Sequence, residues 1–544
     1  MKKIGLLLFL TVCAITIFAQ SGMYRLQLTD KGNSPYGIHQ AEHFLSTKSI
    51  DRRTKQNLAV NESDLPIDPA YFAALEEAGA TIQTYSKWVE TIVVNISDQE
   101  TLDLVALLPF VASMKKVHNN TSAMYSNIDS ENTEIKNHAT SAPLSQFGDD
   151  YGLAKTQIAL NNALFLHELG YKGKGMTIAV IDAGFKNADS HPAYWDNQQI
   201  LGTKNFTHEE GDLFRSSEEH GAKVLSLMLA NNPYSMIGTA PEASFYLLKS
   251  EVTINEEEYP VEEDYWVAAL EYADSLGVDL VTTSLGYTTF KDAPSMNHTW
   301  SELDGETVPA SRAASMAASK GLLLLHSAGN EGHLTWKRVS VPADAKNILT
   351  VGAVKNDSTI AAFSSWGKTV DDRFKPDVVA QGEGAYVLFP NNQVAKGNGT
   401  SYSAPIMAGM TACLWQAFPS LTAIEVINLI KSSSDRLNTP DEHYGFGLPD
   451  FRKAYEMQGM AIKPFSNRTN GFLTYNSSLR QIQFYDEYSY PANLRFTIYS
   501  LSGRLLYQNE TKENGLNVNF LSAGYYIAIV EGNGKSYHCP FIIR

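Results

Sequence analysis

The chain has 544 residues, 44% of them hydrophobic, and a formal net charge of −16 at pH 7. This length is too great for one hydrophobic core and predicts about three or four domains. The negative charge argues against nucleic-acid binding, which needs a basic surface, and against attraction to anionic membranes. We therefore expect partners other than nucleic acids and lipid surfaces.

Residues 1–20 have the pattern of a secretory signal peptide. Two lysines precede a short apolar run over 4–18, and Ala19 supplies a small residue near a cleavage point. The alternative is a membrane anchor, but the run is short for a bilayer span. After removal of this segment Cys413 and Cys539 remain, in segments assigned to different domains, so we expect free thiols.

Residues 21–118 predict a small α/β unit. Alternating or β-branched segments predict strands, and apolar residues at helical spacing predict helices. The expected strands lie at 24–28, 89–96 and 112–117, and the expected helices at 69–78 and 101–111. With a β-α-β-β-α-β order, this unit suits a ferredoxin-like fold. Residues 119–149 follow as an exposed linker, rich in Asn, Ser and Thr and vulnerable to proteolysis.

Residues 150–458 alternate apolar strands with helices. The strands are expected at 176–181, 244–248, 278–284, 322–326, 348–354 and 375–380. The helices are expected at 221–229, 263–276 and 311–320. Nearly continuous apolar strands predict an α/β fold, a parallel sheet with helices on both faces. Residues 463–544 instead show short alternating strands, such as 495–499 and 525–530, which predict a small β-sandwich.

A serine in the sequence Gly399-Thr400-Ser401 precedes the apolar run 406–418. Glycine lets the backbone turn tightly and lets another molecule approach closely. A helix that starts here presents unpaired N–H groups and partial positive charge, which suits a developing anion. Ser401 is thus a candidate nucleophile, although an isolated serine in this setting is more often an ordinary helix cap.

Three other polar residues lie at predicted strand ends or helix starts. Asp182 follows the strand over 176–181, where α/β folds place their sites, and His220 stands at a helix start. Asn330 lies on a tight loop after the strand over 322–326, where a side-chain amide can donate to an oxyanion. Taken alone, each has a structural explanation: a cap or loop aspartate, a structural histidine and a turn asparagine.

The combined order of these residues along the chain is Asp182, His220, Asn330 and Ser401. On these motifs the chain resembles the subtilases, the subtilisin-like serine peptidases, over about residues 170–455. The resemblance implies that Ser401 attacks the scissile carbonyl, that His220 carries its proton to the leaving amine, and that Asp182 holds the imidazole. It also implies an oxyanion hole made by the Asn330 side-chain amide and the backbone N–H of Ser401.

Two further segments resemble the substrate-binding parts of the family. Ser284-Leu285-Gly286 is similar to the segment that pairs with the substrate backbone as an extra strand. Together with Ser327-Ala328-Gly329 it is expected to form the walls of the primary specificity pocket. Other matches to family landmarks lie at 238–243, 375–378 and 444–447.

Two positions depart from the family's usual pattern. The residue after the aspartate is usually Ser or Thr, and here it is Ala183, which has no hydroxyl to support the aspartate. The histidine motif usually continues with Thr-His, and here it has Ala222-Lys223. Neither change removes an essential atom, so we expect activity. The alternative is a catalytically inactive subtilase fold that serves as a surface binding or display protein.

The two flanking domains also resemble known families. Residues 21–118 resemble a subtilase prosegment, on Phe44-Leu45-Ser46 and Arg52-Arg53. Such a prosegment is expected to assist folding and to inhibit through its C-terminal end, and the alternative is an independent binding module. Residues 463–544 resemble the sorting domain of the type IX secretion system, and the alternative is a generic β-sandwich appendage. The matching segments there are 501–506, 521–526 and 541–544.

The expected protein is thus a secreted serine endopeptidase made as a preproenzyme and exported through the inner and outer membranes. Its expected partners are protein or peptide substrates, its own prosegment and the secretion machinery, with no nucleic acid. The resemblance implies no cofactor for catalysis and leaves a structural calcium ion open. No metal ligand is assigned, because the sequence has no clear calcium loop.

Two acidic groups, 256–258 and 262–264, precede and begin the helix that leads to Ser284. We interpret them as a solvated surface loop, the usual setting of a charge run. A second interpretation places them at the border of the cleft, where they favour basic substrate residues.

Overall fold

The computed structural model describes residues 21–119, 151–194, 199–209, 211–233, 235–253, 257–291, 293–462, 471–476, 480–486, 494–500, 504–513, 515–532 and 535–543. The expected signal peptide and linker residues 120–149 lie outside the described residues. Within them, no helix is long and apolar enough to cross a membrane. Cys413 and Cys539 are both buried, and neither forms a disulfide, as expected.

The N-terminal domain is an antiparallel sheet with the strand order β2-β3-β1-β4. Its strands are β1 (Gly22–Leu28), β2 (Thr81–Ser86), β3 (Thr91–Ile96) and β4 (Val111–His118). Its helices are α1 (Thr47–Lys55), α2 (Pro69–Glu77) and α3 (Gln99–Ala106). Leu75 of α2 and Val105 of α3 share one core with Leu26 and Val94 of the sheet. The ferredoxin-like prediction is confirmed.

Two details of this domain differ from the sequence prediction. The helix expected over 101–111 ends at Ala106, because Val111 already begins β4 and pairs with Leu28 of β1. Helix α1 is not predicted at all. Its sequence, TKSIDRRTK, contains a single large apolar residue, so apolar periodicity gives no signal.

The central domain is built on a parallel sheet with the strand order β15-β12-β11-β10-β5-β9-β6. Its strands are β5 (Thr177–Asp182), β6 (Ile200–Asn205), β9 (Ser244–Lys249), β10 (Leu280–Thr283), β11 (Leu323–Ser327), β12 (Leu349–Val354) and β15 (Val378–Gln381). The strand expected over 375–380 is divided, because Pro376 separates β14 (Phe374–Lys375) from β15.

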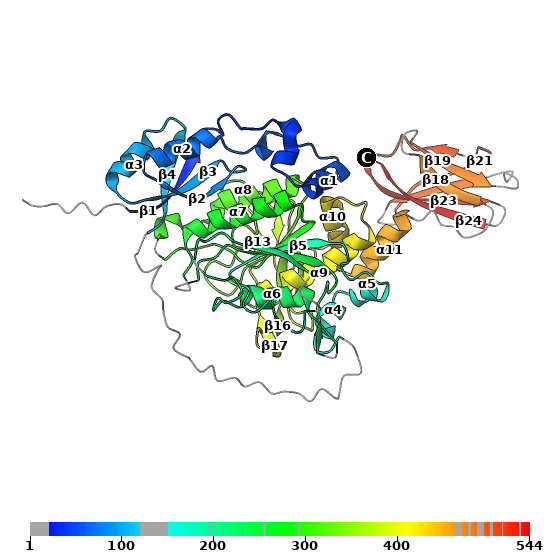
Figure 1. Ribbon diagram of the computed structural model, residues 1–544. Coiled ribbons are helices and arrows are strands. Elements are labelled where there is room, and N and C mark those ends of the chain that lie inside the picture. Colours follow the sequence, from blue (N-terminus) through cyan, green and yellow to red (C-terminus); the bar gives the residue numbers. More distant parts are fainter. Residues whose placement is uncertain are drawn as a thin grey trace, which may run out of the picture.

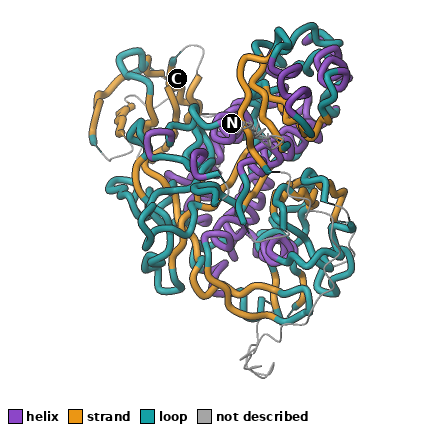
Figure 2. The backbone as a smooth tube through the Cα atoms, turned by 90° about the vertical axis from the view of Figure 1, so that its left-hand side faces the viewer, coloured by secondary structure: helices purple, strands orange, loops and turns teal. Residues whose placement is uncertain are grey.

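Helices cover both faces of this sheet, as predicted (Figures 1 and 2). Ile178 and Val180 of β5 belong to one core with helices α6 and α9, whereas Ala179 and Ile181 belong to a second core with α7 and α8. The main helices are α6 (His220–Leu229), α7 (Pro260–Leu276), α8 (Pro309–Ser319), α9 (Thr400–Ala417), α10 (Ala423–Ser433) and α11 (Phe451–Ile462). The smaller elements are α4 (Lys155–Ala159), α5 (Leu164–Glu168), β7 (Asn231–Asn232), β8 (Met236–Ile237), β13 (Gly367–Lys368), β16 (Glu383–Leu388) and β17 (Val394–Asn398).

The C-terminal domain contains two antiparallel sheets, as expected for a β-sandwich. Their strand orders are β18-β19-β22 and β21-β20-β23-β24. Buried side chains of both sheets, such as Ile482 and Phe496, form one core. The strands are β18 (Gly471–Asn476), β19 (Gln481–Asp486), β20 (Leu494–Ser500), β21 (Leu505–Thr511), β22 (Gly515–Asn517), β23 (Gly524–Gly532) and β24 (Lys535–Ile543).

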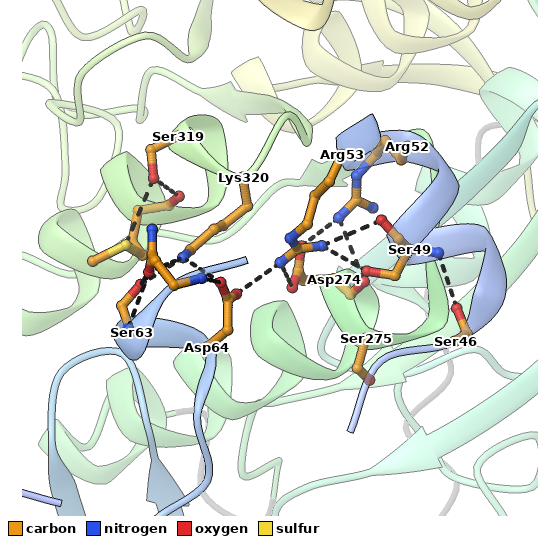
Figure 3. Close-up of polar contacts among 12 residues, drawn as sticks. Ser46, Ser49, Arg52, Arg53, Ser63, Asp64, Asp274, Ser275, Ser319 and Lys320 are labelled. Atoms are coloured by element: carbon orange, nitrogen blue, oxygen red, sulfur yellow. Dashed lines mark hydrogen bonds and ion pairs between the residues drawn. The ribbon is translucent and has the colours of Figure 1, made fainter. Parts of the chain in front are cut away.

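The N-terminal domain sits on helices α7 and α8, and buried charges join it to them (Figures 1 and 3). Arg53 of α1 lies 2.9 Å from Asp64 and 2.7 Å from Asp274 of α7. Asp274 also pairs with Arg52, and Asp64 accepts a hydrogen bond from Lys320 at 2.9 Å. All five side chains are 5% exposed or less. Each domain therefore supplies charges that the other needs, because an unpaired buried charge is costly.

A second charge cluster lies inside the central domain at Asp377, just before β15. Its carboxylate accepts hydrogen bonds from Lys375 at 2.7 Å, from Lys431 at 2.9 Å and from the backbone N–H of Thr350 at 2.9 Å. Burial opposes ionisation, but the two lysines lower the pKa of Asp377 to about 2. A carboxyl group with a depressed pKa stabilises the fold above its unfolded pKa, and this contribution is lost as pH falls through the folded value.

Asp377→Asn should lower the free energy of unfolding at pH 7 by about 3 kcal/mol, because two lysines lose their counter-charge in a buried setting. The difference from wild type should shrink as pH falls from about 4 toward 2. Urea unfolding over this pH range measures it. Asp372→Asn is the control, because Asp372 is 80% exposed in its pair with Lys368 and should change stability little. A pH-independent difference for Asp377→Asn would contradict the assignment.

Candidate active site

Asp182 ends strand β5 and is fully buried. Its Oδ1 accepts a hydrogen bond from the backbone N–H of Ala183 at 2.8 Å and lies 2.7 Å from Nδ1 of His220. Its Oδ2 is buried and has no hydrogen-bond partner among the described residues. Ala183 has only a methyl side chain, so the residue next in sequence supplies no hydroxyl to this second oxygen.

His220 is the first residue of α6, and a close approach of this helix to β5 brings it to Asp182. A Cβ on Gly221 would lie 2.6 Å from the Gly184 carbonyl oxygen and 2.9 Å from Cβ of Asp182, so glycine is needed there. The carboxylate of Glu218 accepts a hydrogen bond from the backbone N–H of His220 at 2.8 Å. Burial disfavours the charged imidazolium, but the carboxylates of Asp182 and Glu218 outweigh it and raise the pKa of His220.

Ser401 is the second residue of α9, where helix N–H groups lack intrahelical acceptors. It is 9% exposed and lines the same cleft as His220. Among the described residues, its Oγ donates to the carbonyl oxygen of Ser284 at 3.3 Å rather than to His220. Catalytic hydrogen bonds are often long or poorly aligned before substrate binds. The Ser284 hydroxyl in turn donates to the Ser401 carbonyl at 2.9 Å, which joins α9 to the end of β10.

Asn330 is oriented by the residue before the serine. Its Oδ1 accepts hydrogen bonds from the backbone N–H of Thr400 at 2.9 Å and from the Thr400 hydroxyl at 3.1 Å. A backbone N–H can only donate, so the side-chain oxygen must face Thr400. The Asn330 amide nitrogen, a double donor, is therefore directed away from this contact.

The structure brings the predicted site residues to one cleft of about 360 Å³. His220, Asn330 and Ser401 line it, and Asp182 lies behind His220. The predicted substrate-binding residues that line it are Ser284, Leu285, Gly286, Ser327 and Gly329. Ala328 is not among its lining residues, since its side chain is fully buried with Val339 and Ala343.

The solvated surface loop that we favoured describes only part of the acidic run, since Glu258 is exposed and Glu257 is half-buried. The second acidic group contradicts the prediction. Glu262 to Asp264 are buried in the first turns of α7. Glu262 accepts the backbone N–H groups of Tyr259 and Val252, at 2.6 and 2.7 Å, so it caps this helix. Glu257, Glu258 and Glu262 line the cleft, whereas Glu256 lies outside the described residues. For Glu262, the prediction that a run of charged residues is solvated fails because it does not consider helix capping.

Five other acidic or polar residues of the cleft are missed by the sequence reasoning. They are Glu218, Glu251, Thr253, Glu331 and Ser340. Glu218 and Glu331 lie next to recognised motifs and adjacency alone could have suggested them. Glu251 and Ser340 carry no such signal, because each lies in a loop whose path depends on the folded sheet.

Three carboxylates of this cleft could be considered for a cation. Oxygen atoms of Glu251, Glu258 and Glu262 lie within 4.8 Å of one another. Calcium takes six to eight oxygen ligands, and both oxygens of Glu262 already accept backbone N–H groups. Tyr287 donates to Glu251 as well, at 2.7 Å. We therefore assign no calcium ion to this group, and structural calcium remains an expectation from the resemblance.

Asp182→Asn should lower the pKa of His220, because the carboxylate that favours the protonated imidazole is lost while burial stays. An NMR titration of the imidazole protons measures this shift. Glu218→Gln serves as a comparison and should give a smaller decrease, since its carboxylate contacts the backbone of His220 and not its ring. An unchanged His220 pKa in Asp182→Asn would contradict the proposed electrostatic coupling.

Comparison with known proteins matches three parts of the chain to known families. The subtilase family model matches residues 173–447, a Bacteroidota propeptide domain of peptidase S8 matches 23–134, and a secretion system C-terminal sorting domain matches 476–544.

Subtilisin E of Bacillus subtilis (strain 168) is 29% identical over 291 residues, which cover 53% of this chain and 68% of that protein. Subtilisin of Bacillus pumilus is 28% identical over 53% of this chain and 94% of its own length. An alkaline protease of Shouchella clausii is 27% identical over 58% of this chain and 71% of its own. The chain belongs to the subtilase family and is a subtilisin-like serine endopeptidase, exported by type IX secretion to the cell surface or beyond it.

Proposed function

We propose that Asp182, His220 and Ser401 form the catalytic triad of this peptidase and that it hydrolyses peptide bonds through an acyl-enzyme. The observation that carries the proposal is the 2.7 Å contact between Asp182 and Nδ1 of His220, in the cleft that Ser401 and Asn330 also line. With Nδ1 engaged by the carboxylate, Nε2 is the nitrogen left to act as a base.

In the first half-reaction, Ser401 Oγ attacks the scissile carbonyl carbon and its proton passes to Nε2 of His220. The carbonyl oxygen becomes an oxyanion, which the Asn330 amide and the backbone N–H of Ser401 stabilise. Asp182 stabilises the imidazolium without taking the proton. The intermediate then expels the amine, which receives the proton from His220, and the acyl group stays on Ser401.

In the second half-reaction, a water molecule gives its proton to His220 and attacks the acyl carbonyl. The tetrahedral intermediate collapses, the carboxylic acid leaves, and Ser401 recovers its proton from His220. Ser284-Leu285-Gly286 line the cleft beside the serine, where this segment would pair with the substrate backbone. Protein and peptide chains are thus the proposed substrates.

Neither departure from the family pattern breaks the contact between Asp182 and His220, which supports the proposal. Lys223 pairs with Glu219 at 3.0 Å and lies over the ring of Phe389, so its charge has a partner outside the triad. Ala183 leaves Asp182 Oδ2 without a partner in the described structure, which weakens the support of the aspartate but not its bond to His220. The alternative, a catalytically inactive fold for surface binding or display, therefore has little structural support.

The N-terminal domain is proposed to act as a folding aid and inhibitor of the peptidase. Its sheet and α1 pack on α7, and Arg25 of β1 donates to Asp264 at 2.7 Å across the same interface. Strand β4 ends at His118, whose ring lies 4.6 Å from that of Tyr259, next to Glu258 of the cleft wall. The chain therefore leaves this domain beside the cleft, and cleavage within or near the following linker is proposed to give the mature enzyme.

Ser401→Ala should abolish peptide hydrolysis, with a loss of about 10⁴- to 10⁶-fold, the range known for loss of a triad member in this family. It should also remove labelling by a serine-directed phosphonate. Intact-mass and N-terminal analysis should find the variant at full length where wild type is processed. Hydrolysis at a near wild-type rate would rule out Ser401 as nucleophile, and identical processing of both proteins would favour the inactive fold or another processing enzyme.

Arg53→Met should reduce the yield of folded, processed enzyme several-fold, because it leaves Asp64 and Asp274 with one fewer buried counter-charge. Arg452→Met is the matched control, since Arg452 is 60% exposed in its pair with Glu456 and should leave the yield unchanged. Secreted enzyme is quantified by phosphonate labelling of Ser401. Equal yields from both variants would contradict the folding role of this interface.

A further inference from the structure

The imidazole of His220 is held by a single hydrogen bond among the described residues. Its Nδ1 lies 2.7 Å from Oδ1 of Asp182, whereas Ser401 Oγ donates to the Ser284 carbonyl and not to the ring. One hydrogen bond fixes the position of one ring nitrogen but leaves the ring able to turn about that contact. The side chain is also 29% exposed, so water borders part of it. A packing contact is therefore needed to fix the direction of Nε2.

Tyr402, the residue after the proposed nucleophile, supplies a packing contact of this kind. The centroids of its ring and of the His220 imidazole are 6.5 Å apart, and the two planes are inclined by 26°. This separation is within the range of offset aromatic pairs. Tyr402 is 9% exposed and belongs to the core that α6 and α9 share. Its ring is thus a fixed surface beside the imidazole.

The hairpin of β16 and β17 limits the space of the tyrosine ring. A Cβ on Gly397 of β17 would lie 2.4 Å from Cε2 of Tyr402 and 3.0 Å from its Cζ, so any other residue at 397 would displace the ring. The hairpin is itself anchored to α6, because the backbone N–H of Leu388 donates to Ser226 Oγ at 3.1 Å. The strand beside the ring is therefore fixed to the helix that begins with His220.

The hydroxyl group of Tyr402 adds no hydrogen bond to this arrangement within the described part of the chain. Burial, and after it the charges of Asp182 and Glu219, raise the pKa of Tyr402 to about 12. The phenol is therefore neutral at neutral pH and brings no charge to the imidazole. The aromatic ring, rather than its hydroxyl, is the part of Tyr402 that can act on His220.

We propose that Tyr402 is a positioning residue of this peptidase, whose ring holds the imidazole of His220 with Nε2 directed at Ser401. Gly397 is the residue that leaves room for the ring in this position. Tyr402 acts through His220 and takes no part in proton transfer itself. This inference rests on the proposed function, because it assumes that His220 is the base that activates Ser401.

Tyr402→Leu removes the ring and keeps an apolar side chain in the core. It should lower kcat about 10- to 100-fold with little change in KM, because a small displacement of a catalytic group slows the chemical step. The pKa of His220, measured by NMR titration and by the pH profile of kcat/KM, should rise, since less burial then opposes the imidazolium. Tyr402→Phe keeps the ring and should keep wild-type values of all three quantities.

A second variant displaces the ring without removing it. Gly397→Ala should lower kcat about tenfold, because its methyl group pushes the ring of Tyr402 out of place. Combined with Tyr402→Leu it should have no further effect, since leucine ends before the Cε and Cζ positions. Gly202→Ala is the matched control. A Cβ there would lie 3.1 Å from Cε1 of Tyr246, and Gly202 does not line the cleft, so kcat and KM should not change.

Two results would overturn this inference and leave the proposed function standing. One is a wild-type kcat with an unchanged His220 pKa in Tyr402→Leu, and the other is a Gly397→Ala effect that persists in full in the double variant. Circular dichroism checks that each variant is folded. If Tyr402→Leu does not fold, folded Gly397→Ala decides alone, and an unchanged kcat in it overturns the inference. Wild-type enzyme that shows neither hydrolysis nor phosphonate labelling of Ser401 overturns the proposed function as well.

Discussion

The burial of the central sheet on both faces is the constraint that determines where the polar residues of the site can lie. Side chains of β5 alternate between two apolar cores, so a polar group cannot lie along the middle of the strand without cost. Polar residues can begin where the strand ends. Asp182 ends β5, Ser284 follows β10, and Asn330 lies shortly after β11. Because parallel strands end at the same edge, these three residues are neighbours although they are far apart in sequence.

The helices that cover the sheet supply the rest of the site at that edge. Helices α6 and α9 begin there, so His220 and Ser401 come from first turns, where N–H groups are free to bind an anion. Close packing at these starts depends on glycine and on side-chain to backbone bonds, such as Thr400 to Asn330 and Ser284 to Ser401. The rigid scaffold thus holds side chains from separate segments in a defined geometry, as preorganised catalysis requires.

The buried charges at helices α7 and α8 explain why the N-terminal domain places charged residues against them. Asp274 of α7 and Lys320 after α8 carry buried charges whose partners, Arg53 and Asp64, belong to that domain (Figure 3). Removal of the domain would return these groups to water, where they need no partner. The same interface also has an apolar part, because Met23, Trp88 and Val93 of the N-terminal domain share one core with Tyr265 and Trp266 of α7.

The sequence predicts the sheet, its helices and the motif residues because these depend on local patterns: apolar runs, strand ends and glycine-flanked loops. It fails where a position is set by tertiary contact. Helix α1 is polar and packs on α7, so its sequence has no apolar periodicity from which a helix could be predicted. Glu262 is read as a surface charge, but it caps α7 from a buried position. Ser340 has no motif, because its place between the walls depends on backbone contacts to Ala328 and Tyr287.

The charge of the acidic cleft and the protonation of His220 both depend on pH. Burial and the neighbouring carboxylates raise the pKa of Glu251 and of Glu262 well above the usual value for glutamate. Their negative charge therefore develops at higher pH than on an exposed surface, so the cleft becomes more negative as pH rises. Over the same direction of change His220 loses its proton and becomes able to act as a base. A rise in pH therefore makes the cleft more negative and removes the proton from the imidazole of His220 in the same direction of change.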